Sequence, residues 1–315
     1  MSKENVKFRT SIGGQALLEG ILMRGVDKQA IVVRKPDGET VEKIEPVKPL
    51  RLKYPILGWP LIRGSVNFVE TLVNGVKALM YSAEFMPEEE QEQETSKLDR
   101  WLEKHLSGEK AEQAIIGVSV FFGILLAVAL FFMLPTVIAG LFTGLVKSSV
   151  LRNLIEGVIR IVIFLAYIIL ASKMKEIKRV WMYHGAEHKT IFCYEKGLDL
   201  TVENARTQPR LHPRCGTSFL FIVMIVSILV TSVVTWTTVW LRLVIRIALL
   251  PVIVGISYEI IKYAGRHDNV LTRILSAPGK ALQLVTTAEP EDDMLEVAIK
   301  ALKLVLPDEE GADRW

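Results

Sequence analysis

A long stretch of uncharged, apolar residues constrains this chain more than any other feature. Residues 114–134 form a run of 21 residues without a charged side chain, and the apolar character continues past Pro135 to residue 146. A helix of about 20 apolar residues crosses the hydrocarbon core of a bilayer, so residues 114–146 predict a first membrane span. Their excess length predicts a tilted helix, a kink at Pro135 or a re-entrant end.

Three further segments have the composition of membrane spans: 154–172, 219–240 and 243–261. Charged residues make up 23% of the chain and its mean hydropathy is +0.32, values that fit membrane spans joined to soluble segments. We therefore expect a polytopic α-helical membrane protein with about four transmembrane helices. Only two residues separate the third span from the fourth, so we expect a tight antiparallel hairpin there.

Two ionisable side chains stand within the second span. Glu156 and Arg160 are four residues apart on one helix face, so we expect them to pair with each other. A path for protons or ions would need such groups stacked through the bilayer, and the spans show no such series. An ion transporter or sensor is therefore the least favoured class of function.

The distribution of positive charge predicts the orientation. The connection 172–218 holds nine Lys and Arg residues, whereas the connection 146–153 holds two. Positively charged loops stay on the cytoplasmic side, so residues 172–218 and, with four spans, both termini are expected there. No signal-peptide pattern occupies the first thirty residues. We expect a multi-pass protein of the bacterial cell membrane (the plasma or inner membrane), with Cys193 and Cys215 reduced.

Residues 1–60 predict a small β-rich α+β unit in the cytoplasm. The β-prone runs 30–34 and 40–44 flank a Pro-Asp-Gly turn, a pattern typical of a hairpin. Upstream, residues 13–25 contain four glycines, which predict tight turns or close approach of backbones. Their spacing matches neither the P-loop nor the dinucleotide-binding fingerprint.

The remaining segments flank the spans. Residues 61–113 predict an amphipathic helix, lying on the membrane or against the β unit, and then an acidic linker at 88–94. Residues 262–315 form a cytoplasmic C-terminal segment. Within it, residues 289–306 predict an amphipathic helix that docks on the soluble unit.

The loop 173–218 carries the motif with the clearest chemistry, His184-Gly185-Ala186-Glu187-His188. Two histidines four residues apart on a helix present their rings on one face, a spacing that suits a transition metal. The order H-x-x-E-H is that of the inverzincin metalloproteases, in which the glutamate is the general base. We therefore expect Glu187 to be catalytic and His184 and His188 to be metal ligands.

Further ligands are expected from His212 and Cys215, which form an H-x-x-C step, with Glu195 and Glu203 as alternatives. Mixed ligation by His, Glu and Cys suits Zn²⁺ best among the divalent transition metals. Three protein ligands would leave an open position for catalysis, whereas four would make a closed structural site.

Alternative interpretations of these residues stay open. His184 and His188 also fit the boundary of an amphipathic helix, with Cys215 as a small buried side chain. His267 and Asp268 follow the fourth span, where we expect them either to hydrogen-bond to a ligand imidazole or to cap the span.

Four motifs, in this order, resemble the YqhQ family: Gly13-Gly14-Gln15-Ala16 with Glu19-Gly20 and Met23-Arg24-Gly25, then Tyr183 to Lys189, Leu200 to Asn204, and His212 to Phe219. The resemblance covers nearly the whole chain. Members are bacterial membrane proteins described as predicted metal-dependent enzymes, with no settled activity. The resemblance therefore implies a metal site at His184, Glu187, His188, His212 and Cys215, and implies no substrate.

Together these features favour a cytoplasm-facing, zinc-dependent membrane enzyme, and Glu187 favours hydrolysis. The alternative is a scaffold or a factor in membrane-protein biogenesis, in which the metal would lock the loop 172–218 to the β unit. Arg206, Arg210 and Arg214 would then meet anionic lipid, or ribosomal RNA at a translocon. The net charge of +3 gives no indication of DNA binding.

Overall fold

The chain divides into two compact units. The computed structural model describes residues 6–86, 108–141, 146, 148–232, 239–267, 269–309 and 311–314. The first unit comprises Met1–Phe85, Ile168–Ser227 and Ile245–Trp315, and the second comprises Met86–Tyr167 and Ile228–Val244. The acidic run predicted to be a linker, 88–94, lies outside the described residues.

A four-stranded antiparallel sheet forms the centre of the first unit, with its strands in sequence order. The strands are β1 (Gly13–Leu17), β2 (Gly20–Arg24), β3 (Lys28–Arg34) and β4 (Thr40–Pro46). The predicted hairpin is confirmed, because Arg34 pairs with Thr40 across its turn. Gly38 takes a φ of 86° in that turn, a conformation that costs glycine little.

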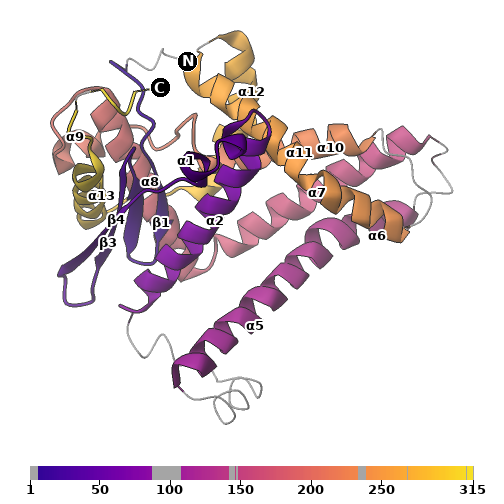
Figure 1. Ribbon diagram of the computed structural model, residues 1–315, viewed down its shortest axis with the longest axis horizontal. Helices are drawn as coiled ribbons and strands as arrows, with labels where there is room; N and C mark the ends of the chain where they lie inside the picture. Colours follow the sequence, from indigo (N-terminus) through magenta and orange to yellow (C-terminus); the bar gives the residue numbers. More distant parts are fainter. Residues whose placement is uncertain are drawn as a thin grey trace. The chain divides into compact units, whose positions relative to one another are not determined.

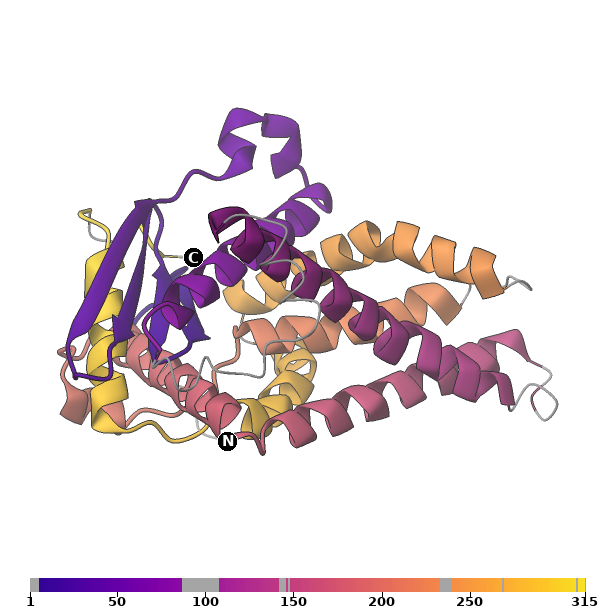
Figure 2. The same cartoon turned by 90° about the horizontal axis from the view of Figure 1, so that it is seen from below.

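The first unit also contains several helices. They are α1 (Leu50–Lys53), the 3-10 turn η1 (Pro55–Gly58), α2 (Ile62–Ala83), α8 (Lys175–Glu195), α9 (Val202–Arg206), most of α10 (Gly216–Ser232), most of α11 (Val239–Arg266), α12 (Val270–Thr286) and α13 (Asp292–Val305). Of these, α2, α8 and α13 pack on the sheet. Figures 1 and 2 show the sheet between α2 on one side and α8 with α13 on the other.

Each face of the sheet has its own core, because side chains alternate along a strand. Met23 and Val32 are buried in a cluster with residues of α8 and α13, whereas Leu22 and Ile31 are buried with Ala78 of α2. The sheet therefore positions α8, which carries the H-x-x-E-H motif, through its own apolar side chains.

Two predicted amphipathic helices are present. The helix predicted at 289–306 is α13, which begins with Asp292 and Asp293 in its first turn and buries Met294 and Leu295. The helix predicted in 61–113 is α2, which packs on the sheet through small residues such as Ala78. The apolar face of α2 that includes Leu72 does not pack on the sheet, since Leu72 is 56% exposed.

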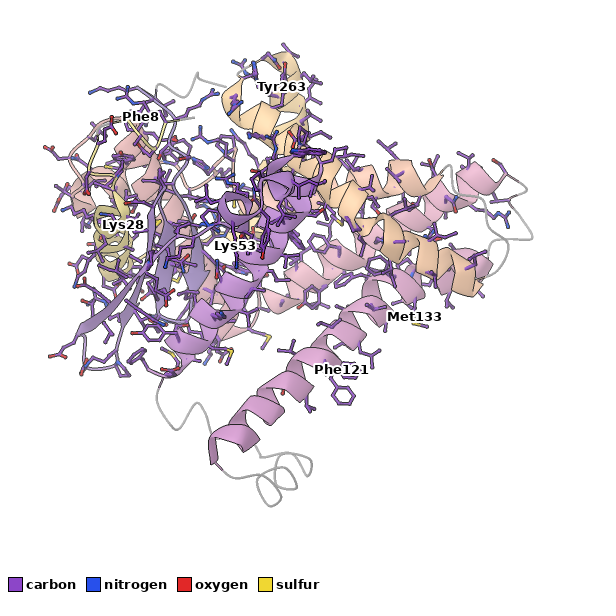
Figure 3. All side chains as sticks on the ribbon, in the orientation of Figure 1. Phe8, Lys28, Lys53, Phe121, Met133 and Tyr263 are labelled. Atoms are coloured by element: carbon purple, nitrogen blue, oxygen red, sulfur yellow. The ribbon has the colours of Figure 1, made fainter. Side chains whose placement is uncertain are left out.

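Three helical segments of the described chain are long and apolar enough to cross a membrane: Gly117–Leu141, Val150–Ala171 and Val244–Arg266. Helix α10, at the place of the expected third span, is apolar but shorter, with 17 residues. Large apolar side chains point outward from these segments, as Phe121 shows in Figure 3, where it is 63% exposed. Such exposure is compatible with a membrane protein, whose outer side chains meet lipid.

The two-residue hairpin predicted between the third and fourth spans is wrong. Leu241 and Arg242 lie within α11, which begins at Val239. Helix α10 spans Gly216–Ser232, and residues 233–238 lie outside the described residues. Residues 239–243 contain no glycine, proline, asparagine or aspartate that would favour a turn, so Leu241 and Arg242 continue the helix.

The second unit contains α5 (Gly108–Val128), the π-helical turn η2 (Ala129–Met133), α6 (Leu134–Leu141) and most of α7 (Ser149–Ala171). The predicted pair is confirmed, because Arg160 Nη2 lies 3.2 Å from Glu156 Oε1 and both side chains are buried. Pro135 cannot donate a backbone hydrogen bond to the carbonyl of Phe131. Arg160 Nε donates to that carbonyl instead, at 2.9 Å, so the π-helical turn and the ion pair stabilise each other.

Candidate functional site

The H-x-x-E-H motif lies in the buried half of α8. His184, Glu187 and His188 are 7%, 5% and 1% exposed. The two imidazole rings lie edge to face with centroids 4.4 Å apart, as close as their spacing of four residues on a helix predicts. Burial of three ionisable side chains on one helix is costly unless they have partners, so their surroundings matter.

Cys215 completes a cluster with these histidines. It lies immediately before α10, and its Sγ is 3.1 Å from His184 Nε2. One ligand atom from each of His184, His188 and Cys215 lies within 4.8 Å of the other two. Cys193, the other free cysteine, is buried elsewhere on α8 and donates to the Asp199 carbonyl.

Backbone carbonyls orient both imidazoles. His184 Nδ1 lies 2.8 Å from the Thr286 carbonyl, and His188 Nδ1 lies 2.5 Å from the Arg210 carbonyl. Because a carbonyl only accepts, each Nδ1 carries the proton and donates it, and each neutral ring keeps a lone pair on Nε2. Metal-binding histidines are held in this way in many proteins.

This donor set fits a transition metal. Nε2 of His188 is buried and finds no hydrogen-bond partner among the described residues. Tetrahedral Zn²⁺ holds sulfur at about 2.3 Å and nitrogen at about 2.0 Å, which places these ligand atoms roughly 3.5 Å apart. The separation of 3.1 Å between Cys215 Sγ and His184 Nε2 is close to that value. His184, His188 and Cys215 are therefore the residues that could hold a metal.

Glu187 lies beside the cluster and is held by the N-terminal glycines. The backbone N–H of Gly14, on β1, donates to Glu187 Oε1 at 3.0 Å. A Cβ at position 14 would lie 3.0 Å from the carboxyl carbon of Glu187 and 2.7 Å from the Leu22 carbonyl oxygen. Only glycine lets the strand approach so closely.

Burial governs the pKa values of the site. Burial raises the pKa of Glu187 to about 7, although His184 and the Gly14 N–H oppose the rise. Burial lowers the pKa of His188 to about 4. For Cys215, burial favours the thiol, but the proximity of His188 and hydrogen bonds from the N–H and hydroxyl of Thr217 together lower its pKa. At neutral pH these shifts leave His188 uncharged and Glu187 near its midpoint.

Close packing also accounts for the glycine at position 185 of the motif. A Cβ there would collide with the carbonyl oxygen of Ala288, in the linker between α12 and α13. That linker is further held by a hydrogen bond from the Ala288 N–H to the Trp181 carbonyl, at 2.9 Å. The close contact brings the end of α12, with its Thr286 carbonyl, to His184.

His212, expected as a ligand, belongs to a different network. Its Nε2 faces Arg214 Nη2 at 3.2 Å and Glu195 Oε2 at 3.8 Å, and the three-residue cluster does not include it. Glu195, an alternative ligand, is fully buried and binds Arg214 and the Thr10 N–H. Burial favours the neutral carboxyl, but the nearby His212, the charge of Arg214 and the hydrogen bond from the Thr10 N–H outweigh it and lower the pKa of Glu195.

Two other candidates lie outside the cluster, and one is not described. Glu203 is exposed on α9. His267 was expected to support a ligand, but it is exposed at the end of α11, where its ring stacks on Tyr263 at 4.2 Å (Tyr263 is labelled in Figure 3). The carbonyls of Thr286 and Arg210 take the role expected of it. Asp268 lies outside the described residues.

The three arginines expected to meet lipid or RNA bind within the chain. Arg206 pairs with Asp292, Arg210 pairs with Glu289, and Arg214 pairs with Glu195. Arg210 also donates to the carbonyl and hydroxyl of Thr287. Internal acids and carbonyls therefore satisfy these guanidinium groups, which fix the loop 196–214 to α8 and α13.

A cavity of about 220 Å³ reaches the cluster from the side of Cys215. Its walls come from α2, the start of α10 and α11, and include Phe68, Phe219 and Ile261. The cavity is mainly apolar, so a molecule that reaches Cys215 by this route would approach with an apolar part.

Comparison with known proteins places this arrangement in a family. The profile of the family described as "Protein of unknown function (DUF1385)" matches residues 59–308. The chain belongs to this family. It is 36% identical over 313 residues to "Uncharacterized protein YqhQ" of Bacillus subtilis (strain 168), with 97% of this chain and 95% of the relative covered. The resemblance to the YqhQ family is thus confirmed, and no solved structure matches.

Some groups of the site could not be predicted from the sequence. The carbonyls of Thr286 and Arg210 carry no side-chain signal, because any residue offers the same atom. Gly14 did carry a signal: the glycine cluster at 13–25 predicts close approach of a backbone, although not to which partner. The DUF1385 chain uses that approach to hold Glu187.

Proposed function

We propose that this DUF1385 protein is a metal-dependent membrane enzyme that catalyses hydrolysis. One observation carries the proposal: His184, His188 and Cys215 direct three ligand atoms to one point, and Glu187 lies beside them. Three protein ligands with an adjacent carboxylate are typical of catalytic zinc sites, whereas structural sites have four. Zn²⁺ is the metal that fits histidine and cysteine ligands best.

Each residue of the site has its own role in this proposal. His184, His188 and Cys215 would hold the metal, which supplies Lewis-acid catalysis when bound. Glu187 would act as general base, since a carboxyl with a pKa of about 7 accepts a proton at neutral pH more readily than an ordinary one. Gly14 would keep the Glu187 carboxylate in place through its N–H. The cavity at Cys215 would admit the substrate.

The membrane location is part of the proposal. Three helical segments of the described chain have the length and apolarity of spans. The excess of Lys and Arg in 172–218 supports a cytoplasmic position for the site and for both termini, in the bacterial plasma membrane.

Metal analysis of the purified protein tests the proposal. We expect about one equivalent of zinc, lost in His188→Ala and strongly reduced in Cys215→Ser. His267→Ala and Cys193→Ser are the matched controls, because they remove a histidine and a cysteine that lie outside the cluster. Wild-type protein that purifies without metal and takes up none from added zinc would refute the proposal.

The cluster also supports a second candidate function, a scaffold with a structural metal. His188 and Cys215 lie on the two sides of the loop 196–214, so a shared metal would fix that loop. Glu187→Gln separates the candidates, because it keeps the side-chain volume. It would abolish hydrolysis by the enzyme and keep its zinc, whereas a scaffold would keep both its zinc and its cellular role.

A further inference from the structure

A strongly basic cavity lies within the first unit. Its volume is about 530 Å³, and five cationic side chains line it: Arg24, Arg51, Lys262, Arg266 and Arg314. Among the described residues that line this basic cavity, none is acidic. A concave surface with one sign of charge concentrates ions of the opposite sign, so this cavity favours an anion.

Two acids, Glu259 and Glu70, lie near these cations. Glu259 is bound by Arg63, through hydrogen bonds of 2.7 and 2.5 Å. Glu70 Oε2 stays 4.0 Å from Arg24 Nη2. Lys262 and Arg266 stand four residues apart on α11, so they share a helix face and repel each other unless an anion lies between them.

The apolar cavity at Cys215 adjoins this basic cavity. Asn67, Thr71 and Tyr258 line both of them. Asn67 Nδ2 donates to Tyr258 Oη at 2.9 Å, so the shared wall is itself hydrogen-bonded. One ligand with an anionic part and an apolar part would therefore fit both cavities at once.

Both cavities touch the candidate site. Gly14 lines the basic cavity and donates to Glu187. Cys215 lines the apolar cavity and contacts His184. A ligand that fills both would place its charged part beside Gly14 and its apolar part beside Cys215.

Exposed side chains next to the basic cavity are typical of a membrane interface. Arg51 belongs to a segment in which Leu52, Tyr54 and Trp59 are 76%, 49% and 60% exposed. Tyrosine and tryptophan are enriched where lipid head groups meet the hydrocarbon core. The basic cavity thus lies next to side chains that suit the depth of lipid head groups.

We infer that the two cavities together bind a membrane lipid with a phosphate-bearing head group. The phosphate lies among the five cations, where the guanidinium groups of the arginines can form paired hydrogen bonds to its oxygens. The acyl chain enters the apolar cavity toward Cys215. This inference names a substrate class for the proposed enzyme and rests on that function for the hydrolysis, whereas lipid binding itself does not need the metal.

Three probes test the lipid class on the full chain in dodecyl maltoside micelles, by native mass spectrometry. Dioleoylphosphatidic acid has phosphate and chains, dioleoylglycerol has the chains alone, and glycerol 3-phosphate has the phosphate alone. We expect phosphatidic acid to bind at least about tenfold more tightly than either, because charge-assisted hydrogen bonds and apolar burial both contribute. Equal binding of glycerol 3-phosphate would reveal a site for free anions and overturn the inference, as would equal binding of dioleoylglycerol.

Substitutions locate the binding. Arg51→Gln and Arg266→Gln change exposed side chains of the basic cavity, and each should weaken phosphatidic acid binding about tenfold. Arg206→Gln is the matched control: Arg206 is exposed, pairs with Asp292 and lines neither cavity, so binding should not change. Unfolding midpoints within about 2 °C of wild type would verify the fold of each variant. Full affinity in both cavity variants would overturn the inference.

Metal removal separates this inference from the proposed function. Chelation should leave phosphatidic acid binding unchanged. If the protein never binds metal but binds the lipid through Arg51 and Arg266, the inference holds and the proposed enzyme fails. If the protein binds zinc but binds phosphatidic acid no more tightly than dioleoylglycerol and glycerol 3-phosphate, the inference fails and the proposed enzyme stands.

Discussion

The backbone N–H of Gly14 donates to the Glu187 carboxylate at 3.0 Å, although 173 positions separate the two residues in the chain. This contact joins the glycine-rich start of the sheet to the H-x-x-E-H helix. It fixes the carboxylate of Glu187, which neighbours the cluster formed by His184, His188 and Cys215, and so makes the N-terminal sheet part of the site.

Gly14→Ala tests this contact. The added Cβ would press on the Leu22 carbonyl oxygen at 2.7 Å and on the Glu187 carboxyl carbon at 3.0 Å. We expect a loss of stability of about 1–3 kcal/mol, seen as a lower unfolding midpoint, and a displaced Glu187. Gly13→Ala is the matched control, because a Cβ at Gly13 meets nothing within 4 Å and should change stability by less than about 0.5 kcal/mol. Equal midpoints for the two variants would contradict the close packing at Gly14.

The pH dependence of stability should report Glu187 in metal-free protein. Burial raises its pKa from 4.5 to about 7 in the folded chain. A carboxyl that holds its proton more tightly when folded stabilises the fold fully below its unfolded pKa of 4.5. This stabilisation falls as the pH rises and is lost above about 7.

The difference between wild type and Glu187→Gln isolates this contribution, since the lowered pKa of His188 acts in the opposite direction in both proteins. We expect wild type to lose roughly 3 kcal/mol relative to the variant between pH 4 and pH 8. Unfolding midpoints in chelator and detergent measure it. Parallel curves for the two proteins would show that Glu187 titrates normally.

His212→Ala distinguishes the two networks around α8. His212 Nε2 faces Arg214 and Glu195, so the variant should keep the zinc content of wild type. It should nevertheless unfold at a lower temperature, because Glu195 and Arg214 lose a buried neighbour, at a cost of about 1–3 kcal/mol. Loss of zinc in His212→Ala, to the level of His188→Ala, would make His212 a fourth ligand and favour the structural site.

Local patterns in the sequence predicted local structure well. The hairpin at 30–44, the pairing of Glu156 with Arg160 and the neighbouring rings of His184 and His188 each follow from a spacing of a few residues. Hydropathy likewise identified three segments long and apolar enough to span a membrane. In these cases the period of the helix or strand decides which side chains meet.

Contacts between distant segments could not be predicted in this way. His212 and Cys215 stand three residues apart, yet the buried Glu195 attracts Arg214 and His212 away from the cluster that Cys215 joins. Nothing in the spacing of an H-x-x-C step reveals a carboxylate seventeen residues earlier. The start of α11 at Val239 was missed for a different reason: the charge of Arg242 indicated the end of a span, although arginine is a good helix former.

The last prediction concerns the loop 196–214, which hydrogen bonds tie to α8. His188 Nδ1 donates to the Arg210 carbonyl at 2.5 Å, and Lys189 Nζ donates to the Arg206 carbonyl at 2.9 Å. A metal shared by His188 and Cys215 would close this loop at its end and hold the imidazole against Arg210. Closing a loop costs chain entropy, and metal binding offsets that cost.

We therefore expect chelation, or Cys215→Ser, to raise the rate of tryptic cleavage after Arg206 and Arg210 about tenfold or more. Cys193→Ser is the matched control, since this cysteine lies outside the cluster. Cleavage sites are read by mass spectrometry of the fragments. Cleavage after Lys173, before α8 and its hydrogen bonds, should not change, because no ligand holds that part of the chain. If chelation leaves cleavage at Arg206 and Arg210 unchanged while zinc is lost, the metal does not hold the loop. The scaffold candidate, in which a metal shared by His188 and Cys215 fixes this loop, would then be overturned.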